Sequence, residues 1–465
     1  MPTKPIAVSL FSGAGGLDWG FHQVGFQTQI ACEKLEGVAQ TLAKNLGLEL
    51  ATPKTEDIGL RRIVINGDVR EIDFASIRTK PDVLFGGPPC QDFSMAQGSQ
   101  RMGLNGGRGK LYVEFVRAVM FLQPKLFVFE NVPGLVSANE KLAYSTILGD
   151  LTNLEQKRLE VLTRDSHFHA PNNVVQGYNI IFKGVVDSAR LGVPQTRKRL
   201  IIIGLRSDLA EMLKSALSEI QSKLDHDING KDMIFAKFPM TCLETFEGKP
   251  LVDLQTKYKN TIKAYKGILY GTSRPALENW RSDVWQQLKF KVKEDYFLAN
   301  QITDVRRGEF TKAMEEHHNL LCELGWLNKP VASQKFEDNT NLLPKRSNNV
   351  AERMWRIPPN ENYAFVNGTK WQVEGKEISF IYRKLSPLKP APTVMAYGGG
   401  GTYGYHYERN RGQLTLREKA RLQTFSDNFI FEGNATEKRA QIGEAVPPLL
   451  ANRIANLIKK ILDAV

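Results

Sequence analysis

The sequence predicts an α/β protein with a mostly parallel sheet and a second, smaller domain. Short apolar runs alternate with segments of helical periodicity over the first 205 residues, a pattern that places parallel strands between layers of helices. After residue 206 the chain becomes richer in Lys, Asp, Glu and Asn and loses its long apolar runs. Strand-like and helical patterns then return near the C-terminus. At 465 residues the chain is also long enough for two or three domains.

The predicted sheet rests on six apolar runs that are rich in Val, Ile and Phe. They cover residues 6–11, 28–32, 82–87, 126–131, 179–186 and 199–205. Residues 111–122 have apolar side chains at helical spacing and are expected to form one of the intervening helices. Ligands of such sheets bind beyond the carboxyl ends of the strands, so residues at those ends are the first candidates for a functional site.

Residues 206–380 are expected to be a folded region, because the four tryptophans in it need packing partners. They are Trp280, Trp285, Trp326 and Trp355. The Asn-rich stretch 339–349 is predicted to be a loop or linker. Further along, residues 391–396 are strand-like. Residues 414–425 and 447–462 are predicted to be amphipathic helices, the second with proline at its start.

Composition excludes some classes of protein and favours one class of partner. The formal net charge is +12 and the isoelectric point is near 9.3, which favours a polyanionic partner. No stretch approaches the roughly 18 apolar residues that span a bilayer. The start of the sequence lacks the apolar segment of a signal peptide, so a cytoplasmic protein is expected. The cysteines form no C-x-x-C pair, so we expect free thiols and no metal site.

The first candidate for a binding site is the glycine-rich segment FSGAGGLDWGF, residues 11–21, directly after a predicted strand. Gly13, Gly15 and Gly16 allow a sharp turn and a close approach of the main chain to a ligand. Asp18 stands where the dinucleotide fingerprint has its last glycine, so that motif is absent. The segment suits a nucleoside, and the alternative is an ordinary tight turn.

Two acidic residues follow neighbouring strands. Glu33 ends the second predicted strand, and Asp68 follows Ile-Asn-Gly after the next one. Carboxylates at these positions can accept hydrogen bonds from ribose hydroxyls and from an adenine amino group. The alternative for each is a solvated acid or one that caps a helix.

A candidate nucleophile lies in GGPPCQDFS, residues 86–94, where two glycines and two prolines hold Cys90 at the end of a strand. A cysteine after a rigid turn and before a polar loop is expected to be exposed, as a nucleophile must be. The following residues, 91–110, contain five glycines together with Arg101, Arg108 and Lys110. They favour a lid that contacts phosphates, and the alternative is a plain surface loop.

Glu130 ends another apolar strand, where a carboxylate is costly unless it is paired or protonated. A glutamate of raised pKa can donate a proton to a ring nitrogen. Arg197 and Arg199 alternate along the chain, so both side chains are expected on one face of a strand, where they could hold Glu130 and a base carbonyl. A helix cap or salt bridge is the alternative for Glu130, and ordinary surface residues are the alternative for the arginines.

Taken in order, these segments resemble the signature blocks of the cytosine-C5 DNA methyltransferases. The blocks are FSGAGGLDWGF, GDV, GGPPCQDFS, ENVPG, QTRKR, LTLREKARLQTF and QIGEAVPP. The resemblance spans residues 6–205 and about 380–465. It implies a Rossmann-like catalytic domain of the AdoMet-dependent methyltransferase fold, expected at 1–205 plus 425–465. A target-recognition domain and hinge are expected at 206–424, with the specificity region at about 245–350.

The resemblance also assigns roles. Cys90 attacks C6 of a flipped-out cytosine, Glu130 stabilises protonation at N3, and Arg197 and Arg199 orient the base and the glutamate. The positions that match contacts to the cofactor, S-adenosyl-L-methionine, are Phe11, Gly13, Gly15, Gly16, Leu17, Glu33, Asp68, Val69, Gly86, Pro88, Leu111, Glu444 and Val446. Gln91 and Ser94 match loop positions near DNA, and Arg101 and Arg108 are added as expected phosphate contacts.

One block departs from the pattern, because Gly443 is followed by Glu444 where the family usually has asparagine. An amide that donates hydrogen bonds is replaced by a carboxylate that only accepts them. The contact of this position with the cofactor therefore stays open.

Taken as a whole, the resemblance implies methylation of double-stranded DNA by a monomer in the bacterial cytosol.

Residues 353–363 and 387–401 resemble stretches of modification enzymes, which suggests a partner restriction endonuclease. The alternatives are a tRNA cytosine-C5 methyltransferase, disfavoured by the size of 206–380, and a non-catalytic DNA-binding relative, disfavoured by the intact catalytic set.

Overall fold

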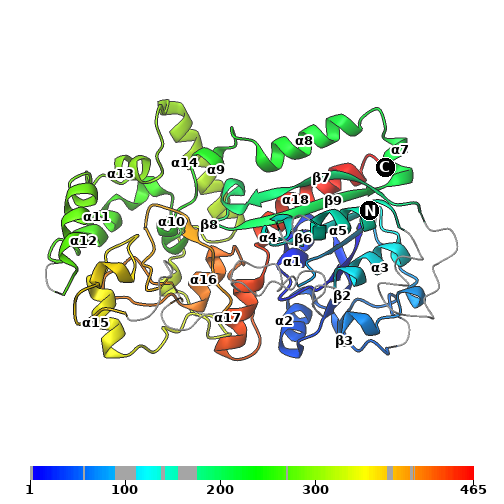
Figure 1. Cartoon of the computed structure of the whole chain (residues 1–465), viewed down its shortest axis with the longest axis horizontal. Helices are drawn as coiled ribbons and strands as arrows, with labels where there is room; N and C mark the ends of the chain where they lie inside the picture. Colours follow the sequence, from blue (N-terminus) through cyan, green and yellow to red (C-terminus); the bar gives the residue numbers. More distant parts are fainter. Residues whose placement is uncertain are drawn as a thin grey trace. The chain divides into compact units, whose positions relative to one another are not determined.

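The computed structural model describes residues 4–55, 58–89, 111–137, 142–154, 175–268, 271–373, 381–397, 402 and 404–465. The candidate residues Cys90, Gln91, Ser94, Arg101 and Arg108 lie outside the described residues. The chain forms two compact units, traced along the sequence in Figure 1. Unit 1 comprises Met1–Ser188, Lys198–Gly230 and Ala445–Val465, and unit 2 comprises Ala189–Arg197 and Lys231–Glu444.

The bounds of these units differ from the domain bounds expected from the sequence. Residues 206–230 belong to unit 1 because α8 (Leu217–Asn229) packs against strand β7 (Tyr178–Asp187) of its sheet. Residues 425–444 belong to unit 2 because α17 (Ala435–Glu444) packs against α16 (Leu416–Leu422). The chain therefore changes unit within the segments that the sequence assigned to single domains.

Unit 1 is built on one sheet, which has eight strands in the described residues. Their order is β3 (Glu49–Ala51), β4 (Ile63–Asn66), β2 (Gln27–Glu33), β1 (Ile6–Leu10), β5 (Val83–Gly86), β6 (Leu126–Asn131), β9 (Lys198–Arg206) and β7. Neighbours from β3 to β6 are parallel, and β9 is antiparallel to both of its neighbours. All six strands expected from apolar runs are present, and the mostly parallel α/β sheet is confirmed.

Helices cover both faces of this sheet, as alternation along β1 shows. Val8 and Leu10 belong to a core cluster that includes Phe115 of α3 (Tyr112–Leu122). Ser9, which points to the other face, donates a hydrogen bond to Asp18 of α1 (Gly16–Val24). On that second face α1 also packs against α18 (Pro448–Leu462).

Unit 2 is mainly helical in its described part. Its longer helices are α11 (Gln255–Lys263), α13 (Val292–Ala299), α14 (Arg307–Glu323), α15 (Asn348–Arg356) and α17. The strand expected at 391–396 is limited to β10 (Ala391–Pro392), which pairs with β8 (Gln195–Thr196). Trp280 and Trp326 are buried as expected, whereas Trp355 is exposed.

In the described part of the chain, the helices are too short or too polar to cross a membrane.

Candidate active site

The glycine-rich segment forms the turn between β1 and α1. Gly13 and Gly15 have φ angles of +55° and +86°, a left-handed conformation that glycine adopts without strain. Gly16 has a different reason to lack a side chain, because a Cβ atom there would collide with the carbonyl oxygen of Val446. Gly16, which was expected to face a ligand, therefore also allows the close packing of residues about 430 positions apart.

Asp18 lies fully buried in the first turn of α1. Its Oδ2 atom accepts a hydrogen bond of 2.9 Å from Ser9 Oγ, and Oδ1 lies 3.5 Å from Thr28 Oγ1. Burial raises the pKa of this carboxyl group to about 7, against the opposing effect of the hydroxyl contacts. The acid that replaces a glycine of the dinucleotide motif is thus part of the support of the turn.

Glu33 ties the glycine turn to the end of β2. Its Oε2 accepts a hydrogen bond of 2.9 Å from the main-chain N–H of Gly13, and its Oε1 accepts one of 2.9 Å from Leu35 N–H. Leu35 directly precedes α2 (Glu36–Leu46), so the carboxylate also serves the start of that helix. The capping alternative is therefore part of its structural role.

Asp68 is surrounded by donors at the end of β4. Its Oδ1 accepts from the main-chain N–H and from Nε of Arg70, and its Oδ2 lies 2.6 Å from an Arg70 guanidinium nitrogen and 3.1 Å from Lys34 Nζ. Arg70 holds the pKa of the Asp68 carboxyl well below its usual range. These four contacts use about all the lone-pair sites that a carboxylate offers.

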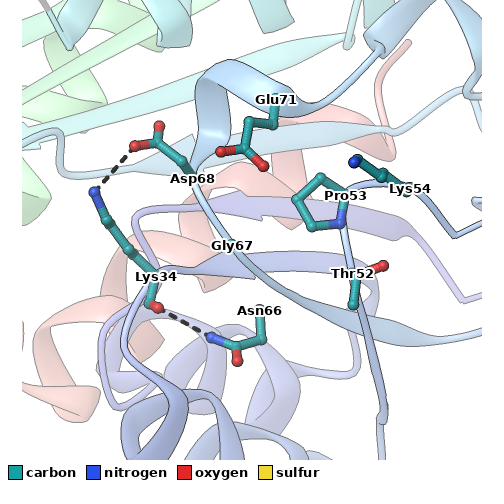
Figure 2. A pocket seen from close by; sticks show the side chains of 8 residues that line it. All are labelled: Lys34, Thr52, Pro53, Lys54, Asn66, Gly67, Asp68 and Glu71. Atoms are coloured by element: carbon teal, nitrogen blue, oxygen red, sulfur yellow. Dashed lines mark hydrogen bonds and ion pairs between the residues drawn. The ribbon is translucent and has the colours of Figure 1, made fainter.

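An open pocket of about 470 Å³ lies beside Asp68, at the carboxyl ends of β2, β3 and β4. Figure 2 shows Lys34 paired with Asp68 on one side and its main-chain oxygen bound by Asn66. The lining residues are Lys34, Thr52, Pro53, Lys54, Asn66, Gly67, Asp68 and Glu71. Of the residues expected to contact a cofactor, Asp68 is the one in this lining, so the expected set extends beyond the pocket.

Glu130 lies against the turn that leads to Cys90. A Cβ atom at Gly87 would be 2.5 Å from Glu130 Oε2, so the carboxylate occupies the space that glycine leaves. Asn131 donates from Nδ2 to the carbonyl oxygen of Pro88 over 3.1 Å. The Glu-Asn pair at the end of β6 therefore holds the Gly-Gly-Pro-Pro turn, which is described up to Pro89, the residue before Cys90.

Arg199 holds Glu130 from the neighbouring antiparallel strand. Its Nε lies 2.9 Å from Glu130 Oε1, and the two side chains are 13% and 11% exposed. Burial lowers the pKa of the Arg199 guanidinium, an effect that the Glu130 carboxylate opposes. The pair fixes one carboxylate oxygen and leaves Oε2 beside Gly87.

Arg197 has a different environment from Arg199. It belongs to unit 2 and is 1% exposed, and its guanidinium donates to the carbonyl oxygens of Val394, Gly443 and Glu444 over 3.3, 2.8 and 3.2 Å. The expectation that both arginines leave one strand on one face is wrong. Strand β8 ends at Thr196 and β9 begins at Lys198, so Arg197 lies between two strands and the alternation rule does not apply.

The remaining expected residues take several positions. Leu17, Gly86, Pro88, Val69 and Val446 are buried, whereas Phe11 and Leu111 are partly buried, Leu111 just before α3. The Glu444 side chain is exposed and accepts a hydrogen bond from Tyr397, which raises the pKa of that tyrosine to about 12. The departure from the family pattern at Glu444 thus coincides with a contact inside unit 2.

Sequence reasoning missed the residues that support this site. Asn131 lay inside the recognised block ENVPG but received no role, Lys34 directly follows Glu33 outside the blocks, and Arg117 and Glu114 of α3 were not considered. The spacing of Glu114 and Arg117, three residues apart on a predicted helix, was the available signal for their ion pair.

Comparison with known proteins identifies first the fold and then the family of the chain. A solved structure, described as a "putative DNA modification methyltransferase" encoded within a prophage (E. coli), matches it with a TM-score of 0.55 and 21% identity, covering 99% of both chains. The fold is therefore that of the Rossmann-like methyltransferases. The model of the C-5 cytosine-specific DNA methylases matches residues 7–460, and the chain belongs to this family.

Two curated relatives agree with the family. The DNA (cytosine-5-)-methyltransferase M.ApeKI of Aeropyrum pernix is 48% identical, over 98% of this chain and 99% of its own length. The type II methyltransferase M.NgoFVII of Neisseria gonorrhoeae is 30% identical, over 99% and 87%. The chain is a DNA (cytosine-5-)-methyltransferase.

Proposed function

We propose that this enzyme transfers a methyl group from S-adenosyl-L-methionine to C5 of a cytosine flipped out of double-stranded DNA, through a covalent bond between Cys90 and C6. The observation that carries the proposal is the placement of Glu130. Arg199 fixes one of its carboxylate oxygens, and the other lies beside the turn that immediately precedes Cys90. The segment that leads to Cys90 is thus packed against the carboxyl group of Glu130.

The residues at the ends of β2 and β4 fit the proposed cofactor. A nucleoside has ribose hydroxyls and an adenine amino group that donate hydrogen bonds, and Glu33 and Asp68 supply carboxylates at neighbouring strand ends. The glycine turn, bound to Glu33 through Gly13 N–H, brings main chain close to the same edge. When bound, S-adenosyl-L-methionine supplies an electrophilic methyl group on a sulfonium centre.

The chemistry assigned to the chain's own residues answers a specific difficulty. C5 of cytosine is a poor nucleophile while the ring is aromatic. The Cys90 thiolate adds to C6 while Glu130 donates a proton to N3, which makes C5 an enamine-like carbon able to take the methyl group. A base then removes the C5 proton, and expulsion of the Cys90 thiolate with return of the N3 proton restores the ring.

The DNA side of the proposal rests on charge and on unit 2. The net charge of +12 favours a polyanion. Flipping is required because a stacked base cannot be reached by Cys90. We assign target recognition to the region about 245–350, DNA contacts to Gln91, Ser94, Arg101 and Arg108, and orientation of the base to Arg199 with Arg197. A monomer that protects DNA from a partner restriction endonuclease completes the proposal, supported by the type II names of the relatives.

The test uses the purified chain with labelled S-adenosyl-L-methionine, offered duplex DNA and tRNA separately, followed by bisulfite sequencing. We expect label on C5 of one cytosine within a fixed DNA sequence. A duplex carrying 5-fluorocytosine at that position should trap the wild-type protein covalently but not Cys90→Ser. Methyl transfer to tRNA alone, or full transfer by Cys90→Ser, would overturn the proposal.

A further inference from the structure

We propose that Arg117 is a positioning residue that sets Asp68 for recognition of the purine of the cofactor. The inference rests on the proposed function, because it takes Asp68 as the acceptor of the adenine amino group. Arg117 lies on α3, and its side chain binds main-chain carbonyl groups of the loop after β4. It acts on the ligand only through that loop.

The hydrogen bonds of Arg117 bind both ends of the first turn of the loop, η1 (Val69–Glu71). One guanidinium nitrogen donates to the carbonyl oxygen of Ile72 over 2.8 Å, and the other donates to that of Val69 over 3.0 Å. Nε donates to Glu114 Oε2 over 2.8 Å, so this neighbouring carboxylate orients the guanidinium group of Arg117. The Arg117 and Glu114 side chains are 12% and 10% exposed.

The guanidinium is also stacked on the loop. Its central carbon lies 4.5 Å from the ring centroid of Phe74, which is buried in the short turn η2 (Phe74–Ser76). A planar group with five donors can stack and bind two carbonyls together, whereas a lysine ammonium has no plane to stack and reaches fewer partners in fixed directions. The site is therefore built for arginine.

The route from Arg117 to Asp68 is a single peptide group. The carbonyl of Val69 and the N–H of Arg70 belong to one planar peptide unit. Arg117 binds its oxygen, and its N–H donates to Asp68 Oδ1 over 3.1 Å. Fixing the plane of this peptide from one side therefore fixes the donor that orients the carboxylate on the other.

The helix that carries Arg117 is itself rigidly anchored. Phe115, Val116 and Val119 are buried in the main core cluster, and Tyr112 donates to Asp150 over 3.1 Å at a buried position. Arg117 thus extends the rigidity of the core to a loop formed of short turns, η1 (Val69–Glu71) and η2. Loss of Arg117 is expected to loosen Asp68 while the core keeps its packing.

The readout is discrimination between two purines. S-adenosylhomocysteine presents an amino group at C6 to the carboxylate, whereas S-inosylhomocysteine presents a carbonyl oxygen, which repels it. A rigid acceptor rejects the wrong partner more strongly than a mobile one. We measure Kd of both compounds by calorimetry for the wild-type protein, Arg117→Met and Arg117→Lys.

We expect Arg117→Met to bind S-adenosylhomocysteine about tenfold more weakly, the scale of one lost charged hydrogen bond, and to lose most of the discrimination. The affinity and the discrimination of Arg117→Lys should lie between those of Arg117→Met and the wild type. In steady state, KM for S-adenosyl-L-methionine should rise while kcat at saturation stays near the wild-type value. If Arg117→Met does not fold, Arg117→Lys decides the question.

Arg206→Met is the matched control. Arg206 also pairs with an acid, Asp208, and donates to a main-chain carbonyl, that of Gln123, but it lies beside the start of β6, at the opposite end of the parallel strands from Asp68. Wild-type discrimination in Arg117→Lys, or equal loss of discrimination in Arg206→Met, would overturn the proposal. Failure of the wild-type protein to bind S-adenosylhomocysteine at all would instead overturn the proposed function.

Discussion

The proposed site has a cofactor side, formed by Glu33 and Asp68, and a base side, formed by Glu130 and Arg199. The two sides hold their carboxylates in opposite ways. Asp68 has four donors around it, three of them on the exposed side chains of Arg70 and Lys34. Glu130 has one oxygen fixed by a buried arginine and the other facing a glycine. The base side is therefore set before its ligand arrives, whereas the cofactor side must exchange a contact. Breaking each side tests this difference.

The largest effect is expected on the base side. Glu130→Gln keeps the shape of the side chain but cannot donate a carboxylic proton to N3, so we expect kcat to fall by about 10²- to 10⁴-fold. Single-turnover methyl transfer measures the loss, and the Kd of S-adenosylhomocysteine should stay unchanged. A near-normal single-turnover rate would remove Glu130 from the chemistry.

A second effect concerns stability beneath the cofactor side. Burial raises the pKa of the Asp18 carboxyl group from its usual 3.8 to about 7 in the folded protein. As the pH rises, the carboxyl group ionises in the unfolded chain before it ionises in the folded protein. The contribution of Asp18 to the free energy of unfolding is therefore fully present below about pH 4 and is lost as the pH rises toward 7. Above about pH 7 it no longer changes. Asp18→Asn lacks this titration, so its stability relative to the wild type should improve over that window, by about 4 kcal/mol at most.

Thermal melting of both proteins between pH 4 and 8.5 measures the change. A difference in Tm that does not vary with pH would show that Asp18 keeps an ordinary pKa in the fold.

A third variant, Gly87→Ala, asks how firmly the base side is set. The added methyl carbon would lie 2.5 Å from Glu130 Oε2, and Arg199 prevents the carboxylate from moving freely away. We expect kcat to fall about tenfold, a cost typical of a misplaced catalytic group. Gly149→Ala is the control, because Gly149 lies in α5 (Leu142–Thr152) with open space around its Cβ position. Equal kcat in the two variants would mean that Glu130 adapts.

The smallest effect is expected at Lys34. It is 68% exposed and forms one contact with Asp68, so it is the donor most easily exchanged for an adenine amino group. Surface ion pairs are worth about 0.2–1 kcal/mol, so Lys34→Met should bind S-adenosylhomocysteine about two- to fivefold more tightly at low salt. This difference in Kd between Lys34→Met and the wild type should become smaller as the salt concentration rises. Weaker binding by Lys34→Met would show that Lys34 assists the ligand.

The sequence predicted the sheet and the strand ends because both follow from local patterns. Buried parallel strands are apolar runs, and a carboxylate directly after such a run, as at Glu33 or Glu130, stands out because its burial is costly unless it is paired. Arg197 could not be placed in this way, since a break of one residue between β8 and β9 removes the alternation on which the inference depended.

Other features depend on contacts between distant parts of the chain. Arg117 binds main-chain oxygens, which every residue has, so side-chain chemistry in the sequence gives no sign of its partners. Gly16 is required by a carbonyl at Val446, and the unit bounds depend on where α8 and α17 pack. Cys90 and the residues proposed to contact DNA, Gln91, Ser94, Arg101 and Arg108, lie outside the described residues, so their roles stay predictions.

The packing of α1 against α18 has a consequence for the order of folding. Gly20 lies so close to α18 that a Cβ atom would collide with Ala451 and with the carbonyl of Pro448. A growing chain that has not yet released α18 from the ribosome leaves this face of α1 bare, while every residue of unit 2 has already been made. Unit 1 therefore completes the packing around α1 only after Ala445–Val465, which follow unit 2 in the sequence, have been made.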